Sequence, residues 1–367
     1  MLVDNPEALR QLCARIGTVD WIALDTEFMR EKTYYPQLCL IQVAAEDVLA
    51  CIDPLAVDIS PLLDAIYSDT LLKVIHAARQ DLEVLCDLRN TPPQPIFDTQ
   101  VAAALLGHEP QIGYGPLVEV LTGAQLQKAY TRTDWQVRPL TPEQLHYAED
   151  DVRYLRQIFP VLSHKLEEAG RGEWLREDCA ALCDVSLYRV EPEHAYRRLA
   201  AGHQLTLPAQ QVLRELAAWR ERTAQSRNLP RTWIADDASL MAIARRSPET
   251  AEDLNRIPGV PRGFIRHAED VLKAVATARA APVEPVWPAV KPPDANDRAA
   301  CKKAAAFVAQ TAAGLGLTPS VLASRRDIQD LVIYTRGPLT QGWRWRVVGE
   351  QLLAMQRDSA RTSLRSP

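Results

Sequence analysis

The length, composition and charge of the chain limit the class of protein. It has 367 residues, of which 47% are hydrophobic and 24% are charged, so a disordered chain is excluded and two or three globular domains are expected. No apolar run approaches the roughly 18 residues that a membrane span requires. The first residues lack a basic segment followed by an apolar one, so we expect no signal peptide.

The net charge of −5 is divided unevenly along the chain. Residues 1–200 carry 18 basic and 31 acidic side chains, whereas residues 201–367 carry 24 basic and 16 acidic ones. Such an asymmetry indicates contact with nucleic acid or with a membrane surface. The seven cysteines include no Cys-x-x-Cys pair, so we expect neither disulfides nor a zinc site, and a reducing, cytoplasmic location.

Strands are predicted in the first hundred residues, where short apolar runs alternate with polar turns. The predicted strands are Trp21–Leu24, Leu38–Ala44, Val48–Ile52 and Leu71–His76. Leucines at helical spacing follow the fourth strand and predict a helix there. A fifth unit begins at Ile96, in which Asp98 is expected to cap a helix that runs to Leu106.

Helices are predicted for most of the remaining chain. Thr141 and Pro142 are typical of a helix start, and this helix is expected to run to about Phe159, where Pro160 breaks or kinks it. Five prolines within residues 282–293 exclude a regular helix and predict an extended linker. A last helical block is predicted over residues 296–357.

Four acidic residues and one tyrosine are placed where they could meet. Asp25 and Glu27 lie two apart at the end of a strand, so both side chains lie on one face if the strand continues. Asp81 opens a helix, and Asp151 lies one helical turn after Tyr147. Carboxylates that meet repel one another unless cations neutralise them, and hard ions such as Mg²⁺ or Mn²⁺ prefer oxygen ligands. Two such ions can activate a water and stabilise the leaving oxygen in phosphodiester cleavage.

Each acid also has an ordinary structural explanation. The pair at the strand end is compatible with a solvated turn, and Asp81 with an acid that favours a helix dipole. Asp98 is better explained as a cap than as a metal ligand, and Glu149 and Asp150 as a solvated helix face. The order of the residues along the chain is therefore what favours a catalytic site.

That order, Asp25-Thr-Glu27, then Asp81, then Tyr147-x-x-x-Asp151, resembles the three motifs of the DEDD 3′→5′ exonucleases, and the tyrosine marks the DEDDy branch. Residues 1–165 also contain the stretches Asp25–Arg30, Tyr34–Gln42, His76–Leu85, Phe97–Gln100 and Arg132–Leu140. Together these stretches look like the bacterial ribonuclease D family in particular. Residues 208–283 are similar to the HRDC domain, and the final block looks like a second, more divergent HRDC-like domain.

The resemblance implies an α/β fold: an RNase H-like exonuclease core with a mixed sheet, followed by two small all-α HRDC-type helical domains. The domains it implies are an exonuclease domain (1–170), a helical connector (171–207), a first HRDC domain (208–283), a Pro-rich linker (284–296) and a second HRDC-like domain (297–367).

The resemblance also implies an enzyme that hydrolyses RNA from its 3′ end with two divalent metal ions, Mg²⁺ or Mn²⁺, and releases 5′-mononucleotides. Its expected role is tRNA 3′-end processing, with tRNA precursors and other structured RNAs with 3′ extensions as partners, no membrane, and no obligate protein partner for a monomer. By resemblance, Asp25 bridges both metals, Glu27 and Asp151 complete the site that holds the attacking water, and Asp81 supports the second metal. Tyr147 orients the nucleophile, since a phenol of pKa near 10 is a poor base at neutral pH.

Seven further residues are candidates for substrate binding. An aromatic or thioether side chain beside the acids can contact the terminal base, and arginine suits phosphate. The candidates are Phe28, Met29, Gln42, His76, Lys128, Arg132 and Arg138. Core packing is the alternative for the first two, a structural hydrogen bond for Gln42 and His76, and a salt bridge for the basic residues.

Two other functions stay open at this point. The same chemistry on DNA is possible, because no residue reads the 2′-hydroxyl on first principles. A non-catalytic RNA-binding scaffold would be expected to lack part of the acid set, and all four acids and Tyr147 are present. The alternating run Trp343-Arg-Trp-Arg346 is compatible with base stacking or, more simply, with tryptophans that anchor a small helical core.

Overall fold

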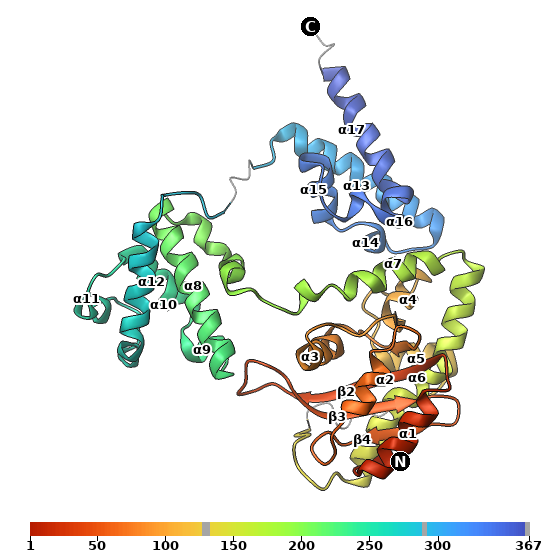
Figure 1. The fold of residues 1–367 in the computed structure, drawn as a ribbon. Coiled ribbons are helices and arrows are strands. Elements are labelled where there is room, and N and C mark those ends of the chain that lie inside the picture. The colour runs from red at the N-terminus through yellow and green to blue at the C-terminus, as the bar shows by residue number, and fades with distance from the viewer. Residues whose placement is uncertain (127–132, 288–291, 364–367) are drawn as a thin grey trace. The chain divides into compact units, whose positions relative to one another are not determined.

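The structure is a computed structural model that describes residues 1–126, 133–287 and 292–363. The chain forms two compact units (Figure 1). The first consists of Met1–Phe28, Leu38–Asp184 and Pro292–Pro367, and the second of Met29–Gln37 and Val185–Lys291. Two predicted substrate-binding residues, Lys128 and Arg132, lie outside the described residues.

A six-stranded mixed sheet forms the centre of the first unit. Its strands are β1 (Leu2–Val3), β2 (Trp21–Met29), β3 (Gln37–Ala44), β4 (Leu49–Ile52), β5 (Leu72–Ile75) and β6 (Ile96–Asp98). They lie in the order β1-β4-β3-β2-β5-β6. The β1–β4, β2–β5 and β5–β6 pairs are parallel, whereas β3 and β4 are antiparallel. This sheet, together with the helical regions that follow it, confirms the predicted fold class.

Helices pack around this sheet. They are α1 (Pro6–Ile16), α2 (Ser60–Ile66), α3 (Arg79–Arg89), α4 (Thr99–Leu105), α5 (Tyr114–Thr122), α6 (Pro142–Glu168) and α7 (Gly172–Leu182). A capping box between Thr141 and Gln144 starts α6 as predicted. The expected break at Pro160 is wrong, because α6 continues through it to Glu168. Leu162 and Leu166 are buried beyond the proline, and their packing offsets the backbone hydrogen bond that proline cannot make.

The C-terminal helices belong to the same compact unit as the sheet. They are α13 (Ala295–Leu315), α14 (Pro319–Leu322), α15 (Arg325–Tyr334), α16 (Gly342–Arg344) and α17 (Glu350–Ser363), with a π-helical turn at Trp345–Gly349. Trp343 is buried and its ring stacks on Trp174 of α7, with ring centroids 4.3 Å apart. Arg344 and Arg346 pair with acids of α7. Trp343 is therefore a core residue of this block.

The second unit is helical. Its α-helices are α8 (Leu207–Arg227), α9 (Arg231–Ile234), α10 (Asp237–Arg246), α11 (Ala251–Asn255) and α12 (Ala268–Ala280). Short 3₁₀ segments, including Pro192–Arg198 and Arg262–His267, complete it. Tyr34, from the loop between β2 and β3, is part of the hydrophobic core of this unit and is only 8% exposed.

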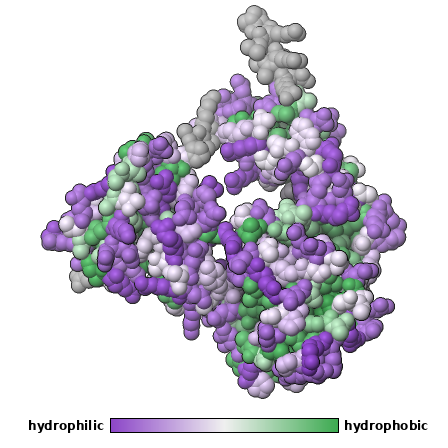
Figure 2. All heavy atoms as spheres, in the orientation of Figure 1, coloured by the Kyte–Doolittle hydropathy of each residue, from purple (hydrophilic) through white to green (hydrophobic). Residues whose placement is uncertain are grey.

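The surface agrees with the composition. Figure 2 shows hydrophilic residues over most of the face drawn, with hydrophobic residues in smaller groups. None of the seven cysteines, all of which lie within the described residues, forms a disulfide. Within the described residues, no helix is both long enough and apolar enough to cross a membrane.

Candidate active site

The end of strand β2 presents two carboxylates. Asp25 and Glu27 are half-buried, and Thr26 between them is buried. Period-two alternation along the extended strand places the two acids on one face and Thr26 on the other. The strand therefore directs both carboxylates to one point.

The third acid, Asp81, lies in the first turn of α3 and is 6% exposed. Its Oδ1 accepts hydrogen bonds from the Thr26 hydroxyl at 2.6 Å and from the Thr26 backbone N–H at 3.1 Å. The turn before α3 is held by Asp98, whose carboxylate accepts from the backbone N–H groups of Ala77 and Ala78. Asp98 also caps α4, as the sequence predicts. These bonds fix Asp81 beside the end of β2.

The fourth acid comes from α6. One carboxylate oxygen from each of Asp25, Glu27 and Asp151 can be chosen so that all three lie within 4.8 Å of one another. All three residues are half-buried. Among the described residues, none forms an ion pair with these three carboxylates. Oxygen ligands at this spacing, without a cationic side chain between them, fit a hard divalent ion.

The electrostatics of the four acids follow from this crowding. Burial raises the pKa of Asp25 well above its usual value, and the charges of Asp81, Asp151 and Glu27 raise it further. Burial, then Asp151 and Asp81, raise the pKa of Glu27 to about 8. Burial and the charge of Asp150 raise the pKa of Asp151 to about 7. The site therefore holds protons at neutral pH unless a cation replaces them.

Asp81 and Tyr147 differ from the cluster in how they are held. Burial raises the pKa of Asp81 to about 6, although the hydrogen bonds from Thr26 lower it. Tyr147 is half-buried, and its ring centroid lies 6.2 Å from that of Trp135. Burial and the charges of Asp151, Glu27 and Asp25 raise the pKa of its phenol. Tyr147 therefore stays protonated at neutral pH and can donate a hydrogen bond.

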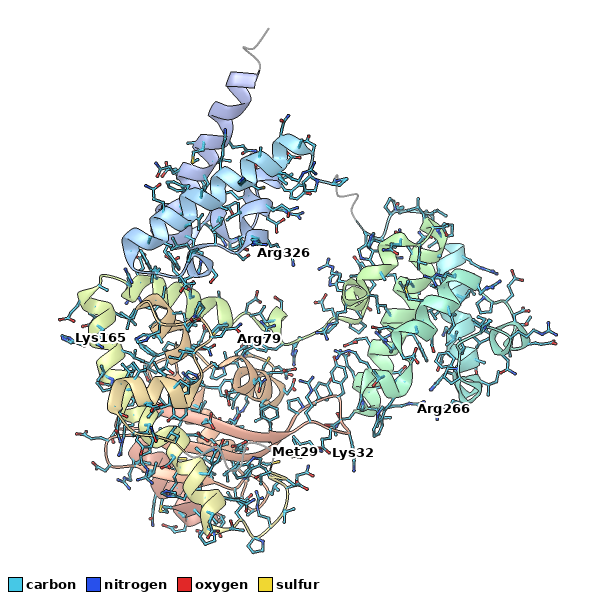
Figure 3. All side chains as sticks on the ribbon, turned by 180° about the vertical axis from the view of Figure 1, so that it is seen from behind. Met29, Lys32, Arg79, Lys165, Arg266 and Arg326 are labelled. Carbon is cyan, nitrogen blue, oxygen red and sulfur yellow. The ribbon has the colours of Figure 1, made fainter. Side chains whose placement is uncertain are left out.

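Of the predicted substrate-binding residues, Phe28 and Met29 continue β2 directly beyond Glu27 and are half-buried. Figure 3 shows Met29 where β2 ends, with Lys32 in the loop that follows. Gln42 on β3 is fully buried, and within the described part of the chain neither of its amide atoms has a hydrogen-bond partner.

His76 and Arg138 have protein partners. His76 Nδ1 lies 2.9 Å from the Thr99 hydroxyl. Arg138 forms two bonds to Asp53, from Nε at 2.6 Å and from Nη2 at 2.9 Å, and donates to the carbonyls of Cys39 and Trp135. The guanidinium of Arg138 therefore has protein partners, as expected if Arg138 forms a salt bridge rather than a contact with substrate. A phosphate contact by this side chain stays a prediction that competes with Asp53.

The sequence analysis did not identify three residues that hold the acids or their elements in place. Thr26 holds Asp81, Asp98 holds the turn before α3, and Tyr114 contacts the backbone of α6 beside Asp151. Thr26 has a sequence signal, because it lies between two candidate ligands. The other two contacts depend on tertiary packing that no local spacing indicates.

Comparison with known proteins agrees with this geometry. A family model described as 3′-5′ exonuclease matches residues 1–167, and one described as HRDC domain matches residues 209–275. A ribonuclease D from Gluconacetobacter diazotrophicus is 37% identical over 371 residues, covering 97% of this chain and 92% of that protein. The chain belongs to the ribonuclease D family. A second family member, from Sphingobium indicum, is 46% identical over 263 residues, covering 71% of this chain and 67% of that protein.

A solved structure supports the same assignment. The crystal structure of Escherichia coli RNase D, an exoribonuclease involved in structured RNA processing, matches with a TM-score of 0.89 and 32% identity. The match covers 98% of each chain. This ribonuclease D family member is a 3′–5′ exoribonuclease, with an exonuclease domain followed by an HRDC region.

Proposed function

We propose that this ribonuclease D family member hydrolyses RNA from the 3′ end with two divalent metal ions, Mg²⁺ or Mn²⁺, and releases 5′-mononucleotides. The observation that carries the proposal is the meeting of Asp25, Glu27 and Asp151, with ligand oxygens within 4.8 Å and no cationic partner among the described residues. Asp81 lies beside them, held by Thr26. Bound ions would lower the pKa of a water and stabilise the leaving 3′ oxygen.

The roles of the side chains follow from their surroundings. Asp25 is influenced by the charges of all three other acids, so it fits the position shared by both ions. Glu27 and Asp151 would complete one ion site, and Asp81 would support the other. Tyr147, protonated at neutral pH, would donate a hydrogen bond that orients the attacking water. Phe28 and Met29 would contact the terminal nucleotide, as the next residues along β2.

We propose tRNA precursors and other structured RNAs with 3′ extensions as substrates of a monomer. The likeness to a structured-RNA exoribonuclease supports this substrate class. The basic excess of residues 201–367 supports it as well, because lysine and arginine bind phosphate. If this is correct, binding should weaken as salt rises.

The test is incubation of the full chain with a 3′-extended tRNA precursor, with Mg²⁺, with Mn²⁺ or with EDTA. Stepwise shortening from the 3′ end, nucleoside 5′-monophosphate as product and complete loss in EDTA are the expected results. A matched single-stranded DNA is the second arm. Equal or faster degradation of the DNA would contradict the RNA preference, and metal-independent hydrolysis would contradict the mechanism.

A further inference from the structure

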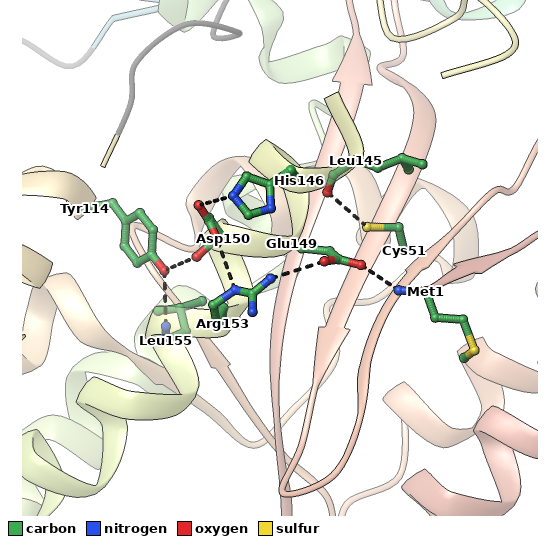
Figure 4. Close-up of polar contacts among 9 residues, drawn as sticks. All are labelled: Met1, Cys51, Tyr114, Leu145, His146, Glu149, Asp150, Arg153 and Leu155. Atoms are coloured by element: carbon green, nitrogen blue, oxygen red, sulfur yellow. Dashed lines mark hydrogen bonds and ion pairs between the residues drawn. The ribbon is translucent and has the colours of Figure 1, made fainter. Parts of the chain in front are cut away.

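The hydroxyl of Tyr114 bonds to the backbone of α6 at two points. Tyr114 begins α5, and its hydroxyl donates to the carbonyl of Asp150 at 2.9 Å. The same oxygen accepts a hydrogen bond from the backbone N–H of Leu155 at 3.1 Å. Figure 4 shows both bonds, with the phenol placed between the two backbone groups.

This bridge adds a side-chain partner to two backbone groups of α6, which is α-helical from Pro142 to Glu168. In a regular α-helix, the N–H of Leu155 donates to the carbonyl of Asp151, and the carbonyl of Asp150 accepts from Tyr154. A side chain that inserts into this ladder changes the local path of the helix. The bridged turn contains Asp151, whose carboxylate belongs to the acid cluster. The position of that carboxylate is therefore linked to the Tyr114 hydroxyl.

Tyr114 is itself held by a ring contact. Its ring centroid lies 5.5 Å from that of His76, which is bound through Nδ1 to the Thr99 hydroxyl. The side chains of Asp151 and Asp25 are near enough to influence the phenol electrostatically. The hydroxyl thus approaches the helix from a fixed position beside the acids.

A second network holds the same turn through ion pairs (Figure 4). Arg153 pairs with Asp150 at 2.9 Å and with Glu149 at 3.2 Å, and the Met1 ammonium binds Glu149. Glu149 and Asp150 are half-buried, and each forms an ion pair. The prediction that these two residues lie on a solvated helix face is therefore wrong. None of these ion pairs uses the helix backbone, so among these contacts only Tyr114 acts directly on the path of the chain at Asp151.

We propose that Tyr114 is a positioning residue that sets the backbone turn carrying Asp151 and thereby the geometry of the divalent-ion site. The inference rests on the proposed metal-dependent function. Without the hydroxyl, the Leu155 N–H and the Asp150 carbonyl keep only their partners within α6, the backbone of this turn shifts, and the Asp151 carboxylate moves relative to Asp25 and Glu27. Groups that orient metal ligands from outside affect metal affinity or activity by roughly 10–100-fold.

The experiment compares Tyr114→Phe with Tyr67→Phe in the full chain. Tyr67 is a matched control in the same unit, because its half-buried hydroxyl also donates to a helix carbonyl, that of Leu85, at 2.6 Å. Mn²⁺ binding is measured calorimetrically without RNA, and kcat and KM are measured on a short 3′-labelled RNA. We expect Tyr114→Phe to weaken Mn²⁺ binding and lower kcat by roughly 10–100-fold, with KM within about twofold. Tyr67→Phe should leave Mn²⁺ binding, kcat and KM unchanged at temperatures where the variant is folded.

Asp151→Asn separates the two proposals. If Asp151→Asn binds Mn²⁺ and trims RNA as the wild type does, the proposed metal site fails. If Asp151→Asn loses Mn²⁺ binding and RNA trimming while Tyr114→Phe behaves like Tyr67→Phe, only the proposed role of Tyr114 is overturned. If Tyr114→Phe does not fold, 4-aminophenylalanine at position 114 keeps a donor and an acceptor there. Recovery of Mn²⁺ binding with this residue supports the inference, and a folded protein with lost binding overturns it.

Discussion

Glu27 in the first unit and Glu221 in the second are both withdrawn from water, but their pKa values move in opposite directions. Burial and the neighbouring acids raise the pKa of Glu27 to about 8. Burial alone would also raise the pKa of Glu221, but hydrogen bonds from Arg231 and Tyr34 outweigh it and hold this pKa below its ordinary value. The difference lies in the partners, since Glu27 faces acids and Glu221 faces a cation and a phenol.

The Glu221 cluster is complete without any ion from solution. Arg231 binds both carboxylate oxygens, with Nε and Nη2 each at 2.6 Å. The Tyr34 hydroxyl donates to Glu221 and accepts from Arg231 at 2.7 Å, and the guanidinium carbon lies 4.5 Å from the centre of the Tyr34 ring. A buried acid with its own cation stabilises a fold, whereas buried acids that face each other need a cation from outside. That contrast is the physical sign of a functional site.

The strongest test of this contrast is Asp25→Asn. Removing the central carboxylate should lower RNA hydrolysis by about 10³-fold, because bound ions supply several kcal/mol of transition-state stabilisation. The same change removes repulsion, so the metal-free protein should become more stable to heat. Single-turnover cleavage and thermal unfolding in EDTA measure the two effects. Asp64→Asn, which alters an exposed ion pair with Arg89, is the control and should change neither.

Arg231→Met tests the Glu221 cluster of the second unit. It leaves the buried Glu221 carboxylate without its cation and should lower the free energy of unfolding of the second unit by about 3 kcal/mol. Arg222→Met on α8, the helix that carries Glu221, removes a pair with Glu193 in which both side chains are more than half exposed, and should have little effect. Urea unfolding followed by hydrogen exchange measures both. Adding Glu221→Leu to Arg231→Met should recover part of the loss, and a further loss would contradict the model of a paired charge.

Most of the acid cluster could be predicted from sequence because the spacing of its residues is local. Asp25 and Glu27 share one strand face, and Tyr147 and Asp151 share one helix face, so two elements supply four of the five residues. The four predicted strands and the cap at Thr141 follow from equally local patterns. Asp81 needed the likeness to a family, because only tertiary contact with Thr26 brings it to the site.

The parts that could not be predicted depend on contacts distant in sequence. The segment Met29–Gln37 belongs to the helical unit, with Tyr34 in its core nearly 190 residues from Glu221. The block from Pro292 onward belongs with the sheet, where Trp343 stacks on Trp174. No periodicity in either segment indicates such a partner. The continuation of α6 past Pro160 likewise depends on packing rather than on propensity.

Changing pH should separate the two clusters in the metal-free protein. The pKa values of Glu27, Asp151 and Asp81, at about 8, 7 and 6, lie above their ordinary values, so protonation stabilises the folded first unit. That stability is present below pH 4 and is lost as pH rises from about 4 to 8. The pKa of Glu221 is lowered, so its contribution is lost only as pH falls below its ordinary range.

We therefore expect the melting temperature of the first unit in EDTA to fall between pH 5 and pH 8, and Mg²⁺ to restore it. The second unit should change little over this interval. Calorimetry with and without Mg²⁺ checks both statements. Asp25→Asn should make the melting temperature of the first unit depend less on pH. An unchanged dependence in that variant would mean that groups outside the acid cluster cause it.

The smallest expected effect comes from Tyr34→Phe. The variant keeps the buried ring, its contact with Arg231 and the backbone bond from Tyr34 to Asn228, and loses only the hydroxyl. Since Arg231 still binds both oxygens of Glu221, we expect a loss of about 1 kcal/mol in the stability of the second unit. Asn228→Gly is the matched control for the backbone bond, because glycine tolerates the positive φ of 48° at that position.

Tyr34→Phe also separates stability from catalysis. The loop that carries Tyr34 directly follows β2, which holds Asp25 and Glu27, yet within the described residues the hydroxyl contacts none of the acids there. At temperatures where the protein is folded, kcat on a short RNA should stay within about twofold of the wild type. A fall comparable to that of Asp25→Asn would mean that Glu221 and its partners act on the reaction as well as on the fold, and the contrast between the two clusters would no longer hold.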